Sequence, residues 1–354
     1  MRNTRSMKAA RVAVAASAFA PSGAADGVID SHARITPALR AAPGPRSVRI
    51  AKGIVLKVAS VLLFAVMSAL IRGFGETVPV GQVVFFRSAF AIVPVVIIYA
   101  ARGELMAALR TDHPFGHLAR GVISVFGMFL SFAALARLPL VDATVISFAA
   151  PLITVALAAL ILKERVRAYR WSAVVIGFLG VIVMLTPYLD LGGAVASAPA
   201  TGALLALSAA FCNAGTVIQT RRLTVTETTS AIVFYFSSFC AVAGLLTLPF
   251  AWHPPTELEL AKLVAIGVLA GVAHILLTEG YRFAPASVLA PFEYTAMVWA
   301  FVLGYVLFGE MPTSAVLLGA VIIAASGLFV IWREHLLGLE RPRPRVRART
   351  AGWG

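Results

Sequence analysis

Ten windows of about 20 residues, each with at most two charged side chains, follow one another along most of this chain. The hydrocarbon core of a bilayer is roughly 30 Å thick, and an α-helix rising about 1.5 Å per residue needs about 20 residues to cross it. Helices of a soluble protein would instead show apolar stripes separated by polar residues. The sequence therefore predicts an all-α membrane protein with ten transmembrane helices, over residues 53–72, 80–100, 116–136, 142–162, 170–187, 201–220, 230–250, 261–281, 287–308 and 313–332.

The composition and the placement of charge agree with a membrane protein. Apolar residues make up 60% of the chain and charged residues 13%, and the mean hydropathy is +0.89. The formal net charge of +14 would suit a nucleic-acid partner, but most of the basic excess lies in two terminal extensions and no nucleic-acid-binding motif accompanies it. We therefore predict the lipid bilayer as a partner and no nucleic acid, with the basic tail lying against an anionic leaflet.

The composition also divides the chain into segments. The first fifty residues are rich in Ala, Gly, Pro and Arg and show no periodicity; a cleaved signal peptide stays open there but is not needed for a chain with this many spans. The longest connection between spans is rich in Gly and Ala. The predicted order is a disordered N-terminal extension (1–50), a first repeat with spans one to five (51–188), a linker (189–200), a second repeat with spans six to ten (201–333) and a disordered basic tail (334–354).

The distribution of Lys and Arg predicts the orientation of the spans. If both termini are cytoplasmic, the inner connections hold nine Lys and Arg residues and the outer connections hold three, before the basic tails are counted. Cytoplasmic loops of membrane proteins carry this excess. We therefore predict a multi-pass protein with both termini in the cytoplasm.

The two halves of the chain align with each other. Matching stretches are Phe64–Ile71 with Phe211–Ile218 and Phe85–Ala91 with Phe234–Cys240, and Glu164 and Glu310 stand at the ends of the fourth and ninth spans. Because each copy holds an odd number of helices, the copies lie in opposite orientations, which predicts two inverted five-helix repeats. Such repeats give two equivalent packing states about a pseudo-twofold axis, which is the basis of alternating access to a site near the midplane.

The same residues resemble a known family. The span ends Lys163-Glu164 and Phe308-Gly-Glu310, each followed by a glycine-bearing helix, are similar to the EamA-type ten-helix branch of the drug/metabolite transporter superfamily. Phe85-Phe-Arg-Ser88 and the stretch Ala286–Tyr305 resemble the subgroup that contains bacterial riboflavin uptake carriers and S-adenosylmethionine carriers. The resemblance covers about residues 53–332. It implies a secondary transporter of the bacterial inner membrane whose first four helices in each copy enclose the cavity.

Comparison of the two copies separates scaffold residues from site residues. A polar residue present in both copies is expected to serve the fold, whereas one present in a single copy fits a substrate better. Glu164 and Glu310 occur in both copies, and each can bind free backbone groups or a nearby cation at the end of a span. Gly267-x-x-x-Gly271 is typical of a helix contact in membranes. We predict structural roles for these four residues.

Glu293 is the sharpest candidate for a binding residue. It lies inside the ninth span, its counterpart in the first copy is near Ser147, and Pro291 loosens the local helical hydrogen bonding. An ionisable residue inside hydrocarbon is costly and is a functional candidate by default. It could bind a cationic group or the coupling proton, or be a structural partner of a buried Arg. Tyr294 beside it could offer a flat face to a planar ring.

Further candidates also break the symmetry of the copies. Arg87 in the second span, whose counterpart is Phe236, could hold an anionic group, neutralise Glu293, or form an internal ion pair without substrate contact. Lys57 lies about one turn inside the first span, which favours the interpretation that its side chain snorkels to the cytoplasmic surface of the membrane. Uncharged hydrogen-bonding candidates for the cavity are Asn213, Gln219 and His274, of which His274 could equally be a packing residue.

These observations predict a function and exclude others. The resemblance implies import of riboflavin or a related flavin; the alternative is a carrier or exporter of S-adenosylmethionine or another amino-acid-derived metabolite, which would engage both Glu293 and Arg87. A membrane-embedded lipid-processing enzyme is a remote alternative, because no carboxylate or His cluster stands near one interface. No phosphate-binding loop and no His-Glu-x-x-His motif occurs, so we predict no enzymatic activity, no cofactor and no metal site. The sequence leaves open whether the protein forms a homodimer.

Overall fold

The computed structural model describes residues 46–101, 103, 111, 114–163, 166–188, 198–223 and 229–337, and the predicted extension, linker and tail lie largely outside these ranges. The described residues form helices and contain no strand. The elements are α1 (Arg46–Arg72), α2 (Val80–Ala101), α4 (Pro114–Arg137), α5 (Leu140–Ser147), α6 (Ala149–Ile161), α7 (Ala168–Leu185), η1 (Thr186–Tyr188), α8 (Ala198–Leu223), α9 (Thr229–Leu245), α10 (Leu248–Ala251), α11 (Glu257–Phe283), α12 (Ala286–Leu289), η2 (Ala290–Tyr294), α13 (Thr295–Phe308) and α14 (Ser314–Leu336).

The predicted number of spans is confirmed. Eight helical stretches of the described chain are long and apolar enough to cross a bilayer, and two shorter apolar stretches, Val80–Pro94 and Phe234–Phe250, complete the ten. Two of the long spans are broken helices: α5 and α6 together form the fourth span, and η2 and α13 form the ninth. We call the end of the bundle where α1 begins the inner end and the end where α1 finishes the outer end.

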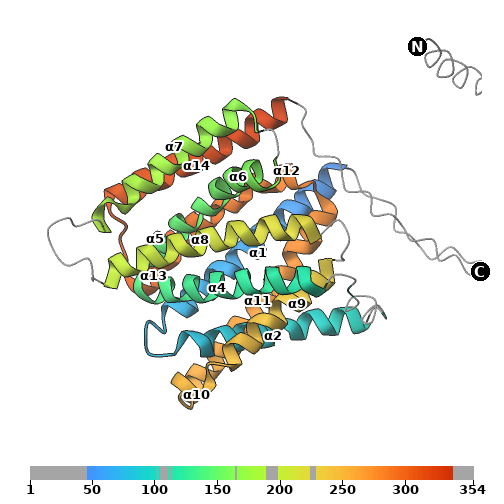
Figure 1. Ribbon diagram of the computed structural model, residues 1–354, viewed down its shortest axis with the longest axis vertical. Coiled ribbons are helices and arrows are strands. Elements are labelled where there is room, and N and C mark those ends of the chain that lie inside the picture. Colours follow the sequence, from blue (N-terminus) through green and yellow to red (C-terminus); the bar gives the residue numbers. More distant parts are fainter. Residues whose placement is uncertain are drawn as a thin grey trace, which may run out of the picture. The chain divides into compact units, whose positions relative to one another are not determined.

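The packing of the helices shows the inverted repeat. Helix α1 packs along α11, and its counterpart α8 packs in the same way along α4, the counterpart of α11. Three helices also pack against their own counterparts: α2 with α9, α7 with α14, and α5 with α13. In Figure 1, α7 and α14 lie side by side at one edge of the bundle, and α2 and α9 lie at the opposite edge. A pseudo-twofold axis requires this pattern, because rotation about the axis replaces each helix by its counterpart and each contact by the equivalent contact.

Glycines allow the third helix of each copy to approach the second helix of the other copy closely. A Cβ atom on Gly267 of α11 would lie 2.6 Å from the carbonyl oxygen of Phe86 and would also clash with Phe90. A Cβ atom on Gly121 of α4 would lie 2.6 Å from the ring of Phe239, which is the counterpart of Phe90 in the second copy. Both repeats therefore use a glycine of the third helix to seat an aromatic residue of the second, as expected for small-residue contacts in membranes.

Gly271 extends the contact between α11 and α2. A Cβ atom there would lie 2.9 Å from Cγ of Pro94 and 3.0 Å from the carbonyl oxygen of Ala91. The spacing of four residues places Gly267 and Gly271 on one face of α11, and that face is the one against α2.

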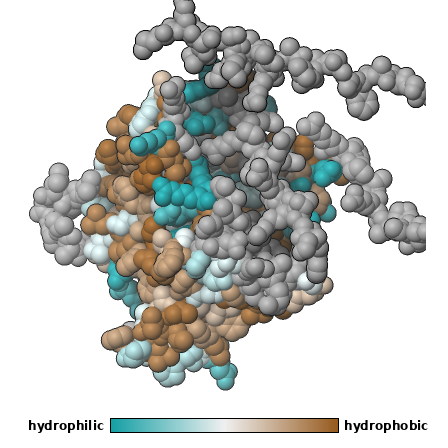
Figure 2. Space-filling model, turned by 45° about the vertical axis from the view of Figure 1, so that its right-hand side comes forward, coloured by the Kyte–Doolittle hydropathy of each residue, from teal (hydrophilic) through white to brown (hydrophobic). Residues whose placement is uncertain are grey.

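The surface of the bundle is apolar where a bilayer would contact it. Large apolar side chains such as Leu179, Val321 and Phe329 are exposed on α7 and α14. Figure 2 shows apolar side chains over much of the face that it presents, with hydrophilic side chains gathered in patches. A soluble protein would not expose such a continuous apolar surface, whereas lipid chains would cover it.

Candidate functional site

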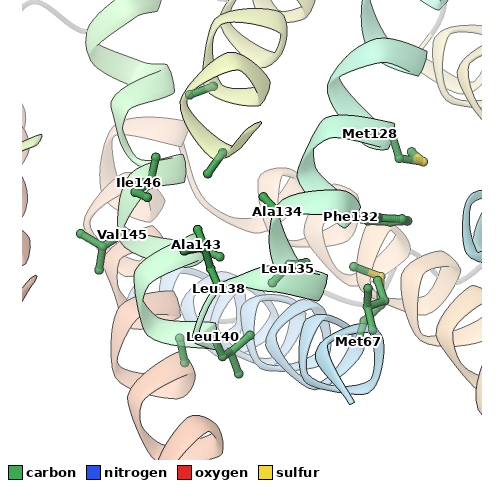
Figure 3. Close-up of a cluster of buried hydrophobic side chains, with 14 of the residues drawn as sticks. Met67, Met128, Phe132, Ala134, Leu135, Leu138, Leu140, Ala143, Val145 and Ile146 are labelled. Carbon is green, nitrogen blue, oxygen red and sulfur yellow. The ribbon is translucent and has the colours of Figure 1, made fainter. Parts of the chain in front are cut away.

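A cavity of about 380 Å³ lies between the two repeats. Its size falls within the range of about 300–1,000 Å³ that is usual for pockets that bind small molecules. Figure 3 shows part of its wall, where Ala134 and Leu135 of α4 lie beside Leu140 and Ala143 of α5. Small, apolar and hydroxyl-bearing residues dominate the lining, whose members are Val61, Phe64, Ala65, Ser68, Ser131, Phe132, Ala134, Leu135, Leu140, Ala143, Thr144, Ser147, Phe148, Pro151, Ala206, Ala209, Ala210, Asn213, Glu293, Ala296 and Ala300.

Both broken helices contribute to the cavity at their breaks. The fourth span is interrupted at Phe148, three residues before Pro151, because proline cannot donate a hydrogen bond and clashes with the carbonyl one turn earlier. The ninth span is interrupted by the 3₁₀ turn η2, which contains Pro291. Ser147 and Glu293, counterparts in the two copies, both line the cavity beside these breaks. Interrupted helices at the interface of inverted repeats are where transporters place their binding sites.

Two aromatic rings mark the place where the broken helices meet. The rings of Phe148 and Tyr294 are stacked, with centroids 5.1 Å apart and planes inclined by 20°. These residues are counterparts at the same offset that relates Ser147 to Glu293, so their contact lies close to the pseudo-twofold axis. Phe148 lines the cavity, whereas the hydroxyl of Tyr294 points toward Gly327 of α14. Tyr294 thus lies behind the cavity wall and supports Phe148.

An ion pair between Lys57 of α1 and Glu293 of η2 stands at one end of the cavity. The Lys57 side chain is 2% exposed and the Glu293 side chain is 54% exposed. The prediction that Lys57 snorkels to the membrane surface is therefore wrong, since its ammonium points inward to a carboxylate. A signal for this was present in the sequence, because Lys57, Ser60, Phe64 and Ser68 recur at helical spacing on one face of α1.

Arg87 lies elsewhere in the bundle, and the predicted neutralisation of Glu293 by Arg87 is replaced by the pair with Lys57. The guanidinium of Arg87 donates to Nε2 of His274 at 3.3 Å and stacks over the ring of Phe236, with 5.6 Å between its Cζ and the ring centroid. An arginine cannot accept a hydrogen bond, so Nε2 of His274 is the acceptor. His274 in turn meets the ring of Phe64 edge-on at 5.0 Å. Neither Arg87 nor His274 lines the cavity.

The two amide candidates lie at different depths of α8. Asn213 lines the cavity, and a Cβ atom on Gly127 of α4 would come within 3.1 Å of its Oδ1, so the two helices approach closely there. Gln219 is partly buried nearer the inner end of α8 and is not among the lining residues. The cavity therefore brings together Glu293 and Asn213 of the predicted binding residues, and leaves Arg87, His274, Tyr294 and Gln219 outside it.

Carboxylates at the outer end hold the helices together. Glu310 accepts hydrogen bonds from Nε of Arg72 at 3.0 Å and from the backbone N–H of Leu140, the first residue of α5, at 2.7 Å. It thus makes both kinds of contact that the sequence predicted for it, whereas its counterpart Glu164 lies outside the described residues. Asp142, which the sequence analysis did not single out, is 3% exposed and bonds to the hydroxyl of Tyr188. The sequence did offer a signal, because Asp142 is an ionisable residue within a predicted span and such residues are functional candidates by default.

Comparisons with known proteins bear on what such a cavity serves. The EamA-like transporter family matches residues 51–186 and 200–332, one match for each repeat. An S-adenosylmethionine uptake transporter of Rickettsia prowazekii is 32% identical over 251 residues, which are 71% of this chain and 81% of that protein. A pseudopaline exporter of Pseudomonas aeruginosa is 30% identical over 279 residues, 77% and 94% of the two chains. A riboflavin transporter of Rhizobium johnstonii is 32% identical over 230 residues, 65% and 74% of the two chains.

Proposed function

We propose that this chain, which belongs to the EamA-like transporter family, is a secondary carrier that loads an amino-acid-derived metabolite into the cavity ending at Lys57 and Glu293. The observation that carries the proposal is the position of this ion pair. A cavity between inverted repeats is the place where alternating access exposes a substrate first to one side of the membrane and then to the other. Glu293 is also the one charged residue among the described residues that line the cavity.

The exposure of the two charges favours a substrate with a positive group. The Glu293 side chain lines the cavity and is half-exposed, whereas the Lys57 side chain is buried and does not line the cavity. A cationic group that enters the cavity can therefore reach the carboxylate and compete with Lys57 for it. S-adenosylmethionine carries an ammonium and a sulfonium, and a relative of this chain is named for its uptake. This reverses the order in which the sequence ranked the two substrate classes.

A second candidate, riboflavin or a related flavin, is favoured by a different observation. Apart from Glu293, the lining holds no charged residue, and Phe64, Phe132 and Phe148 present aromatic surface to the cavity. Aromatic side chains pack well against a planar ring, and Asn213 with Ser131 and Thr144 could bind a polyol. A relative named as a riboflavin transporter is consistent with this candidate.

We also propose that the protein lies in the bacterial inner membrane with both termini in the cytoplasm. The basis is the excess of Lys and Arg in the connections at the inner end. With this orientation, Lys57 and Glu293 lie on the cytoplasmic side of the cavity, because α1 begins at the inner end and Lys57 precedes Val61, the first residue of α1 that lines the cavity.

Uptake by purified protein in liposomes tests the proposal. Vesicles should accumulate labelled S-adenosylmethionine, and excess unlabelled riboflavin should not compete. Glu293→Gln should abolish uptake, while Glu76→Gln, the same change at an exposed carboxylate of the outer loop, should leave it unchanged. Uptake of riboflavin alone would select the flavin candidate. Uptake of neither, with turnover of added lipid, would refute a carrier and support the remote enzymatic alternative.

A further inference from the structure

Two buried arginines face a single aromatic ring in the part of the bundle next to the cavity. Arg87 of α2 is 6% exposed and Arg120 of α4 is 9% exposed. Their Cζ atoms lie 5.6 Å and 5.2 Å from the ring centroid of Phe236 on α9. The face of one ring offers only a weak negative potential, and here two guanidinium cations share it.

The two arginines differ in how completely they are satisfied. Arg120 donates to Oγ1 of Thr220 at 2.7 Å and to the carbonyl oxygen of Ile232 at 3.2 Å. Among the residues that the structure describes, Arg87 donates only to His274, and its Nε and one Nη atom are buried without a hydrogen-bond partner. No carboxylate of the described residues forms an ion pair with either arginine. A guanidinium stays protonated in proteins, so this charge cannot be relieved by loss of a proton.

A permanent charge in this position calls for an anion that the described residues do not supply. Burying a charge without a counterion is costly, and intramembrane arginines therefore pair with an anion or face a water-filled cavity. Within the described chain, Nε and one Nη atom of Arg87 are unpaired, and the other Nη atom, once released from His274, forms with Nε the planar fork that binds a carboxylate through two hydrogen bonds.

The cavity lies two side chains away from this fork. Phe64 lines the cavity, its ring meets His274 edge-on at 5.0 Å, and His274 accepts the hydrogen bond from Arg87. Movement of Phe64 and His274 would therefore join the cavity to Arg87 without any change in the backbone of α2.

We propose that Arg87 is an anion subsite that takes the carboxylate of the transported molecule, reached from the cavity when Phe64 and His274 move aside. This rests on the proposed function, because the cationic end of the same molecule would occupy Glu293. A small free anion such as chloride is the other source of the same chemistry. The assignment makes Arg87 a determinant of specificity for substrates with a carboxylate.

Calorimetric binding to the purified full chain tests the subsite with two probes, S-adenosylmethionine and its decarboxylated analogue. Wild-type protein should bind the decarboxylated analogue at least about tenfold more weakly, which corresponds to the loss of about 1.4 kcal/mol. Arg87→Gln should bind both probes alike, and Arg87→Lys, which keeps the charge but not the fork, should discriminate between them partially. Arg120→Gln, the matched change at the satisfied arginine, should discriminate as wild type does. If Arg87→Gln still discriminates fully, the proposal is wrong.

Two further arms separate the possible outcomes. If chloride removal lowers the melting temperature of wild type but not of Arg87→Gln, and the two probes bind wild type alike, the subsite holds a free anion and the assignment to substrate is overturned. If wild type neither binds nor transports S-adenosylmethionine, the proposed substrate fails. Acetate then decides the subsite: it should raise the melting temperature of wild type and not that of Arg87→Gln, and an equal effect on both would overturn the proposal.

Discussion

Replacing Glu293 by glutamine keeps the size of the side chain but removes the negative charge that faces the Lys57 ammonium. Lys57 is 2% exposed, so its charge would remain buried without a counterion. Replacing Lys57 by methionine keeps most of the apolar stem and leaves Glu293, whose side chain is 54% exposed and lines the cavity, where water can solvate the carboxylate. The two single substitutions should therefore differ in their cost, although they break the same ion pair.

The structure sets the size of the difference. Removing one partner of a buried pair costs about 3–5 kcal/mol when the remaining charge is buried, and we expect a loss of this size for Glu293→Gln. An exposed partner costs about 1 kcal/mol or less, and we expect this for Lys57→Met. The double substitution removes both charges and should return the free energy of unfolding to within about 1 kcal/mol of wild type.

Unfolding by sodium dodecyl sulfate in mixed micelles, followed by the fluorescence of the chain's five tryptophans, measures these differences. The expected order of stability is wild type and the double variant together, then Lys57→Met, then Glu293→Gln. If Lys57→Met were as unstable as Glu293→Gln, or if the double variant were as unstable as the worse single variant, the argument from unequal exposure would be refuted.

Three further predictions concern the scaffold. Gly267→Val should destabilise the bundle by about 1–3 kcal/mol, because even a Cβ atom would lie 2.6 Å from a carbonyl oxygen of α2. Gly73→Ala is the control: a Cβ atom there has its nearest contact at 3.5 Å, so the free energy of unfolding should not change in the same assay. Glu310→Ala should lose about 2–3 kcal/mol, since it removes an acceptor of two hydrogen bonds that join three helices; a loss below that of an exposed ion pair would contradict this role. Hydrogen bonds to the carbonyl oxygens of Pro254 and Thr77 raise the pKa of the exposed His253 imidazole. The protonated imidazole therefore stabilises the fold fully below the pKa of about 6.5 that His has in the unfolded chain, and this stabilisation is lost as pH rises through the higher pKa of the folded protein. Between about pH 6 and about pH 9 the melting temperature should therefore fall more in wild type than in His253→Asn.

The fold could be predicted from the sequence because it depends on quantities that a single chain displays. The length of an apolar window indicates whether a helix can cross a bilayer, and the odd number of windows in each copy places the two copies in opposite orientations. The break in the ninth span followed from Pro291, whose missing N–H weakens the helix wherever it packs. Comparison of the copies also singled out Glu293 and Asn213, both of which line the cavity.

The partners of the polar residues could not be predicted in the same way. A membrane helix is apolar on the face toward lipid and on the face toward protein, so hydrophobicity does not state which way it is rotated. Arg87 was assigned to Glu293 because both are charged and central, but α2 turns Arg87 toward His274 and Phe236, and Lys57 reaches the carboxylate instead.

The asymmetry of the copies also bears on how alternating access would change the ion pair of Lys57 and Glu293. The counterparts of Lys57 and Glu293 are Leu204 and Ser147, and these carry no charge with which to form an equivalent pair. Leu204 is 59% exposed, whereas its counterpart Lys57 is buried and paired with Glu293. If the carrier works by exchange of the two conformations, as we propose, the other state separates Lys57 from Glu293. The ion pair then stabilises only the present state, and a cation that binds Glu293 shifts the population toward the other by as much as it weakens the pair.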